Sequence, residues 1–101
     1  MLATKPVKMV MLIIEEGIRE DVEKIMKKQG IDHWTVWARI EGRGETGPKH
    51  GDPIWPGLNE VFMIAMEEEK VEPLMVKLHA LRDSLPIIPG MRVIIMDAQI
   101  I

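Results

Sequence analysis

The segment VKMVMLII, Val7–Ile14, decides the fold because it is apolar on both of its alternating faces. Such a run predicts a β-strand, which Glu15, Glu16 and Gly17 end. It is too short to span a membrane, and no small-residue cleavage site follows it, so we expect neither a signal peptide nor insertion into a membrane. A strand with two apolar faces needs a cover on each side.

The elements around this strand follow from hydrophobic periodicity and from breaker residues. In chain order we predict a helix over 18–28, a strand over 32–40, a strand over 59–66, a helix over 69–85 and a strand over 91–96. Gly30 ends the first helix, and Pro73 is placed in the first turn of the second. The order βαββαβ predicts a ferredoxin-like α+β fold, an antiparallel sheet with two helices on one face. A chain of 101 residues fits one such domain, 1–101.

The second face of the sheet points to self-association. Met9 and Met11 alternate with Val10 and Leu12, and the strand over 59–66 is apolar on both sides as well. Two helices can cover only one face, so another copy of the chain is the simplest cover for the other. We therefore predict a homo-oligomer, and the alternative is a set of tolerated exposed apolar side chains.

Composition excludes several classes of protein. The net charge is −3, without the basic excess of phosphate-backbone binders, so we expect no nucleic acid partner. The absence of cysteine removes disulfides and thiolate chemistry and agrees with a cytoplasmic location. Ser84 is the only serine, and no nucleophile, base and acid set or carboxylate pair is apparent, so we do not expect an enzyme.

The connection between the two middle strands, EGRGETGPKHGDPIWPGLNE or Glu41–Glu60, holds five of the eight glycines and three of the seven prolines. It does not fit a P-loop, because Pro48 interrupts the spacing and a strand follows where that mechanism needs a helix. The glycines Gly42 and Gly44 would let the backbone approach a ligand, and the side chains of Arg43 and Lys49 suit an anion. The alternative is a solvated hairpin tip.

The βαββαβ order, the Gly42-x-Gly44 stem and the long loop before an apolar strand together resemble the PII signalling superfamily. The resemblance covers nearly the whole chain. It implies a homotrimer whose loop over 41–58, the T-loop of that family, engages a target such as a transporter or an enzyme. It also implies clefts between subunits that hold an effector such as an adenine nucleotide. The effector residues it implies are Gly42, Arg43, Gly44, Lys49, Gly90 and Arg92.

The chain departs from classical members in its stem, which reads Glu45, Thr46, Gly47 where they carry glutamine. We therefore do not expect binding of 2-oxoglutarate with magnesium. There is no tyrosine, which excludes the tyrosine uridylylation of some members. The second helix is followed by RDSLPIIPGMR, in which only Gly90 and Arg92 resemble the equipment of the phosphate loop.

The second half of the loop is the expected partner-binding segment, with His50, Asp52 and Trp55 as its contact residues. Pro53 and Pro56 restrict the backbone on either side of Trp55, which indicates a stiff segment. Two further hypotheses remain open. The chain could be an interaction module that needs no ligand, or a metal-responsive protein in which His50 and Asp52 share a metal ion. We assign no metal ligand or certain cofactor.

Overall fold

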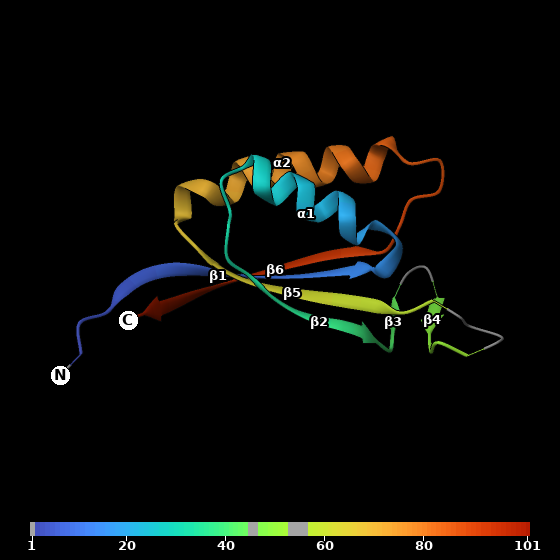
Figure 1. The fold of residues 1–101 in the computed structure, drawn as a ribbon, viewed down its shortest axis with the longest axis horizontal. Coiled ribbons are helices and arrows are strands. Elements are labelled where there is room, and N and C mark those ends of the chain that lie inside the picture. Colours follow the sequence, from blue (N-terminus) through green and yellow to red (C-terminus); the bar gives the residue numbers. More distant parts are fainter. Residues whose placement is uncertain (1, 45–46, 53–56) are drawn as a thin grey trace.

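The computed structural model describes residues 2–44, 47–52 and 57–101, and its elements follow the predicted order with one small hairpin added (Figure 1). The strands are β1 (Lys5–Glu15), β2 (Thr35–Ile40), β3 (Gly42–Gly44), β4 (Gly47–Lys49), β5 (Asn59–Met66) and β6 (Met91–Ile100). The helices are the 3₁₀ turn η1 (Glu16–Ile18), α1 (Arg19–Lys28) and α2 (Glu68–Ser84). No helix among these residues is both long and apolar enough to span a lipid bilayer.

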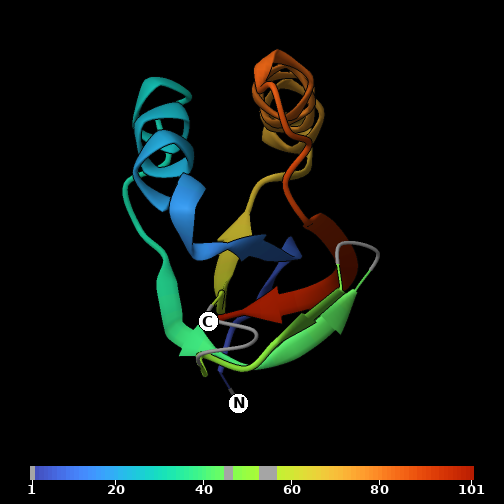
Figure 2. The ribbon, with the colours of Figure 1, turned by 90° about the vertical axis from the view of Figure 1, so that its right-hand side faces the viewer.

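The main sheet is antiparallel with the strand order β2-β5-β1-β6. Its register places Met11 of β1 between Met63 of β5 and Ile94 of β6. Both helices lie on the same face of this sheet (Figure 2). The ferredoxin-like prediction is confirmed.

The core lies between the helices and the sheet. One side of the alternation in β1 and β5 points into it, together with one stripe of each helix. Its members, all at most 9% exposed, include Val10, Leu12, Ile14, Val22, Met26, Phe62, Ile64, Met66, Val71, Leu74 and Leu78. Trp34 packs at the edge of this cluster with its ring centroid 6.5 Å from that of Phe62. At Gly30 the backbone turns to φ +76°, which ends α1 as predicted.

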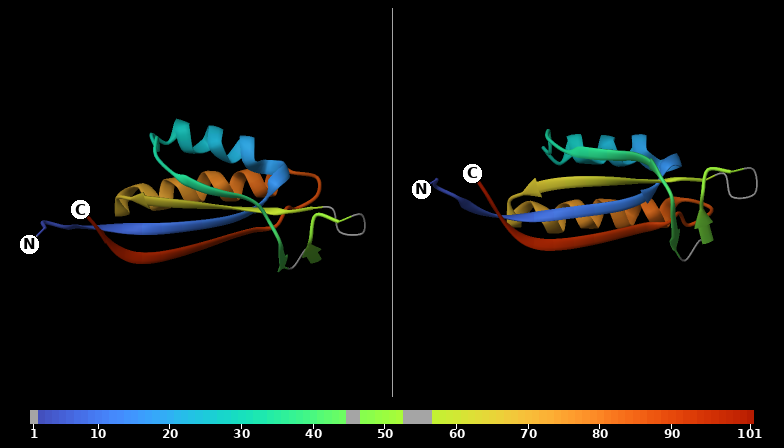
Figure 3. Two further views of the ribbon diagram at one scale, coloured as in Figure 1. Left: turned by 60° about the horizontal axis from the view of Figure 1, so that its bottom comes forward. Right: turned by 90° about the horizontal axis from the view of Figure 1, so that it is seen from below.

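The opposite face of the sheet is also apolar, and no helix in the described part of the chain lies on it (Figure 3). The register places on it Met9, Met11, Ile13, Trp37, Val61, Met63, Ile94 and Met96. Trp37 is 50% exposed, Ile94 39% and Met96 43%. A row of large apolar side chains across four strands is the kind of surface that another protein surface covers.

Several local features differ from the predictions, and β1 and β6 are longer than predicted. The second strand begins at Thr35 and not at Asp32, and a bulge interrupts it between Trp37 and Ile40. The loop over 41–58 contains the hairpin β3–β4, which pairs Gly42 with Lys49 and was not predicted. Pro73 lies in the second turn of α2, because this helix begins at Glu68. Its ring is exposed, and the helix continues beyond it to Ser84.

Candidate functional site

The β3–β4 hairpin projects from one end of the sheet (Figure 1). A cleft of about 470 Å³ lies at this end. The connection from α2 to β6 returns to the sheet at the same end. Ile13 of β1 and Val61 of β5 contribute apolar side chains to the cleft. The hairpin lines it with residues 42–44, 47 and 49, and the returning connection with residues 88–92.

The six residues predicted to bind an effector all line this one cleft. They are Gly42, Arg43, Gly44, Lys49, Gly90 and Arg92. The first four belong to the hairpin, Gly90 directly precedes β6 and Arg92 lies at its start, so the fold joins segments about forty residues apart in the chain. Their role in binding remains a prediction.

The cleft is cationic although the chain is acidic overall. Arg43, Lys49, Arg82 and Arg92 line it with Glu41 as the sole carboxylate among its lining residues in the described ranges. Lys49 Nζ lies 3.6 Å from Glu15 Oε1. Arg43, Arg82 and Arg92 form no ion pair with any other described residue. Three arginines in one cleft, none with a counter-ion among the described residues, favour an anionic ligand.

Arg82 is a residue that the sequence analysis missed. It lies in the last turn of α2, and its Nε atom is buried without a hydrogen-bond partner among the described residues. A buried donor of this kind is rare, because leaving it unpaired costs free energy. The sequence contained part of the information needed to predict this position of Arg82. The helix ends where the connection to β6 begins, so the side chain of its last basic residue faces the same end of the sheet as Arg92.

The bulge in β2 directs the chain out of the sheet and into the cleft wall. Trp37 pairs with Val61, but Ile40 pairs with Asn59, so β2 holds one more residue than β5 across this stretch. Arg39, inside the bulge, adopts φ +56°, a left-handed conformation that few non-glycine residues adopt. The hairpin stem follows directly at Gly42.

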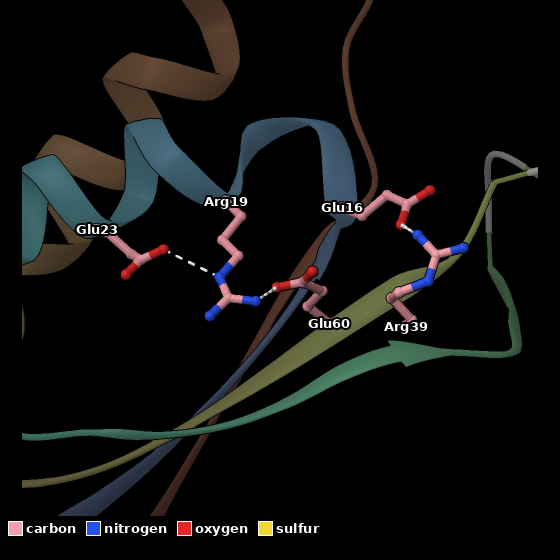
Figure 4. Close-up of polar contacts among 5 residues, drawn as sticks. All are labelled: Glu16, Arg19, Glu23, Arg39 and Glu60. Atoms are coloured by element: carbon pink, nitrogen blue, oxygen red, sulfur yellow. Dashed lines mark hydrogen bonds and ion pairs between the residues drawn. The ribbon is translucent and has the colours of Figure 1, made fainter.

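Two ion-pair groups hold the β1–α1 turn against the neighbouring strands (Figure 4). Arg39 Nη1 lies 3.0 Å from Glu16 Oε2, which ties the bulge to η1. Arg19 bridges Glu23 Oε1 at 2.9 Å and the buried Glu60 Oε2 at 3.1 Å. The hydrogen bond from Arg19 to Glu23 raises the pKa of the guanidinium further above its ordinary value. These contacts fix β5 and the bulge beside the cleft.

The residues predicted to contact a partner lie beyond the cleft. His50 Nδ1 is 3.3 Å from Glu41 Oε1, so this pair closes the open end of the β3–β4 hairpin. Asp52 is exposed. Trp55 lies outside the described residues. In the ranges that the structure describes, no group of three or more histidine and acidic side chains could hold a metal ion.

A second hollow, of about 540 Å³, lies at the opposite end of β1 and β6. It is lined by Lys8, which pairs with Asp97, and by Glu67, Glu68 and Glu69. Its carboxylates outnumber its single lysine, so its charge does not suit the anion that the first cleft favours.

Comparison with known proteins places the fold in one class. No family model matches the chain, and no curated protein matches its sequence. Among solved structures, CPII, a nitrogen regulatory PII-like protein from Thiomonas intermedia, was determined bound to ADP, AMP and bicarbonate. It superposes with a TM-score of 0.82 at 19% identity, covering 98% of this chain and 99% of that one. Its apo form gives a TM-score of 0.77 at 18% identity, over 97% and 95%.

A protein from Thermus thermophilus, proposed to be a PII-like signalling protein, superposes with a TM-score of 0.68 at 17% identity. That match covers 99% of this chain and 94% of the other. At these identities the comparisons show the fold alone. The chain has the fold of PII-like proteins, and the predicted resemblance is confirmed at that level.

Proposed function

We propose that this chain is a trimeric, PII-like regulatory protein that binds an anionic effector, an adenine nucleotide, in the cationic cleft. Binding would change the segment over 41–58, which engages a target protein such as a transporter or an enzyme. The proposal rests on three arginines that line the same cleft as the backbone of Gly42 and Gly44. They are Arg43, Arg82 and Arg92, and none of them forms an ion pair with another described residue.

An adenine nucleotide suits both chemical parts of the cleft. Its phosphates match the arginines, whose planar guanidinium groups bind phosphate through paired hydrogen bonds. Its base matches the apolar side chains of Ile13, Val61 and Ile88. A cleft of about 470 Å³ is in the size range of small-molecule sites. CPII, which has a similar fold, was determined bound to ADP, AMP and bicarbonate, and all three ligands are anions.

The trimer and the regulatory role rest on different observations. Ile94 and Met96 belong to an apolar sheet face that bears no helix in the described ranges, and packing against further copies would cover them. In such a trimer the cleft would lie at a boundary between subunits, as the resemblance to the PII superfamily implies. The proposed role is regulatory, which agrees with a cleft whose arginines and glycines are suited to binding an anion. We place the protein in the cytoplasm.

A thermal-shift titration with ADP, ATP and AMP on protein of known solution mass tests this function. A ligand that binds the native state raises the melting temperature in a saturable way. We expect such a shift with at least one nucleotide on a trimer. Arg92→Met should weaken binding about tenfold or more, the range for a lost hydrogen bond to a charged group. The matched control is Lys77→Met, which removes an exposed positive charge on α2 outside the cleft.

The other hypotheses are outcomes of the same experiment. A trimer that responds to no nucleotide but binds a target with the wild-type loop would be an interaction module without an effector. A shift with divalent cations that disappears in a His50→Ala, Asp52→Ala double variant would indicate a metal-responsive protein. Either result would contradict the nucleotide proposal.

A further inference from the structure

Lys49 stands between the cleft and a carboxylate outside it. Its side chain lines the cleft yet is only 13% exposed, and its Nζ atom lies 3.6 Å from Glu15 Oε1. Lysine is seldom so buried unless its charge is paired. Any anion that enters the cleft therefore meets a cation that already has an internal partner, and the two anions compete for Lys49.

The stem of Lys49 also touches the returning end of the loop. A Cβ atom at Gly57 would lie 3.0 Å from Lys49 Cδ, so the lysine runs along the Gly57 backbone. Gly57 in turn accepts a hydrogen bond of 3.3 Å from the amide of Gly51, which adopts φ +69°. A movement of the Lys49 side chain therefore changes the contact that supports this closure.

Glu15 belongs to a junction that joins the cleft to the loop. Its backbone amide donates to the carbonyl of Gly90 in the cleft wall at 3.2 Å. The next amide, that of Glu16, donates to the carbonyl of Leu58 at the exit of the loop at 3.1 Å. These two hydrogen bonds tie the end of β1 to the cleft wall and to the loop exit. The Glu15 carboxylate, which pairs with Lys49, is carried by this end of β1.

We propose that Lys49 couples the occupancy of the cleft to the loop by exchanging the Glu15 carboxylate for the bound anion. This inference rests on the proposed function in one respect, that the ligand is anionic. Without ligand, Lys49 pairs with Glu15 and supports the Gly51–Gly57 closure. With ligand, Lys49 turns to the anion, leaves Glu15 and withdraws its stem from Gly57. Glu15 is then a competitor that weakens ligand binding.

A double-mutant cycle on ADP binding tests the exchange. Glu15→Gln removes the competitor with little change in shape, so we expect the Kd for ADP to fall by up to about fivefold, the range of a partly exposed ion pair. Lys49→Met should raise the Kd. In the Lys49→Met background, Glu15→Gln should leave the Kd unchanged. An equal effect of Glu15→Gln in both backgrounds would show a general field effect and overturn the exchange.

The exchange rate of the Gly51 amide hydrogen, measured by NMR, reports on the loop itself. Saturating ADP should speed this exchange in the wild-type protein. Glu15→Gln should speed it without ligand, because the lysine loses its ion pair with Glu15. In Lys49→Met, saturating ADP should leave the rate unchanged, whereas Lys77→Met should respond like the wild type. A full response to ADP in Lys49→Met would contradict the coupling.

These outcomes separate the two proposals. If ADP and inorganic pyrophosphate both fail to bind the wild-type protein, the cleft is not an anion site, and the coupling falls with it. If ADP binds but the cycle is additive, the proposed function stands and only the role of Lys49 is lost.

Discussion

Gly42 and Asn59 are packed so closely that a Cβ atom at Gly42 would lie 2.7 Å from Asn59 Nδ2. Real Cβ atoms do not approach other heavy atoms to this distance, so any larger residue at position 42 must displace the amide. Both residues line the cleft. The second glycine of the stem differs, because a Cβ atom at Gly44 would meet no atom of the described residues within 4 Å.

The two glycines of the stem should therefore respond differently to alanine. We expect Gly42→Ala to lower the free energy of unfolding by less than about 1 kcal/mol, because the contact is with the movable end of the Asn59 side chain, and to weaken ADP binding as Asn59 moves. Gly44→Ala should change neither property measurably. Urea unfolding and calorimetric titration of both variants check this. Asn59→Ala in the Gly42→Ala background should restore the lost stability, and equal effects of the two alanines would refute the steric explanation.

The Arg19–Glu60 pair should show an asymmetric response to mutation. Arg19→Met leaves the buried Glu60 carboxylate without its cation, so we expect the free energy of unfolding to fall by about 2 kcal/mol. This is less than for a fully buried pair, because Arg19 is 37% exposed. Glu23→Gln removes only the pair within α1 and should cost about 0.5 kcal/mol. Chemical denaturation measures both, and similar losses would mean that Glu60 is not held by Arg19.

The start of α2 should contribute to acid sensitivity. Glu69 accepts a hydrogen bond from its own backbone amide, which lowers the pKa of its carboxyl group below the ordinary 4.5. A group with a lowered pKa in the folded state adds stability above its unfolded pKa and loses it as the pH falls through the folded value. Acidification below pH 4.5 should therefore lower the stability of the Glu69→Gln variant less than that of the wild-type protein. Parallel curves of melting temperature against pH would contradict this.

The apolar sheet face should hold the oligomer together. Ile94→Glu places a charge at a position that is 39% exposed in one chain, so the monomer should still fold while the proposed trimer dissociates. Val76→Glu, at a position 59% exposed on α2, is the matched control and should remain trimeric. Sedimentation equilibrium at micromolar concentration distinguishes the two. A trimeric Ile94→Glu variant would show that the interface lies elsewhere.

Periodicity predicted the main elements because burial decides them. The alternation of Val10, Leu12 and Ile14 and the stripe of Val22 and Met26 leave few other ways to form one core. The bounds of β5 were predicted to the residue, whereas β6 runs past Met96 to Ile100. That extension includes polar residues, which break the apolar pattern but pair with the long β1.

The site was harder to predict, because tertiary contacts determine its details. The bulge depends on the left-handed conformation of Arg39, a residue type that gives no local sign of it. Arg82 lines the cleft only because α2 ends beside the start of β6. From the sequence alone, Arg82 is an ordinary basic residue in the last turn of a helix. The glycines and cations of the stem were singled out from their residue types, and they do line the cleft, while their binding of an effector stays a prediction.

The most direct test of the central claim is a calorimetric titration of ADP into the wild-type protein and into Arg82→Met. Arg82 is the sharpest choice, because its buried Nε lacks a partner among the described residues and was not part of the resemblance. We predict saturable binding of one ADP per chain to the wild type and a Kd about tenfold or more higher in Arg82→Met. Wild-type protein that binds no ADP, or equal affinities in a correctly folded Arg82→Met variant, would contradict the assignment of this cleft.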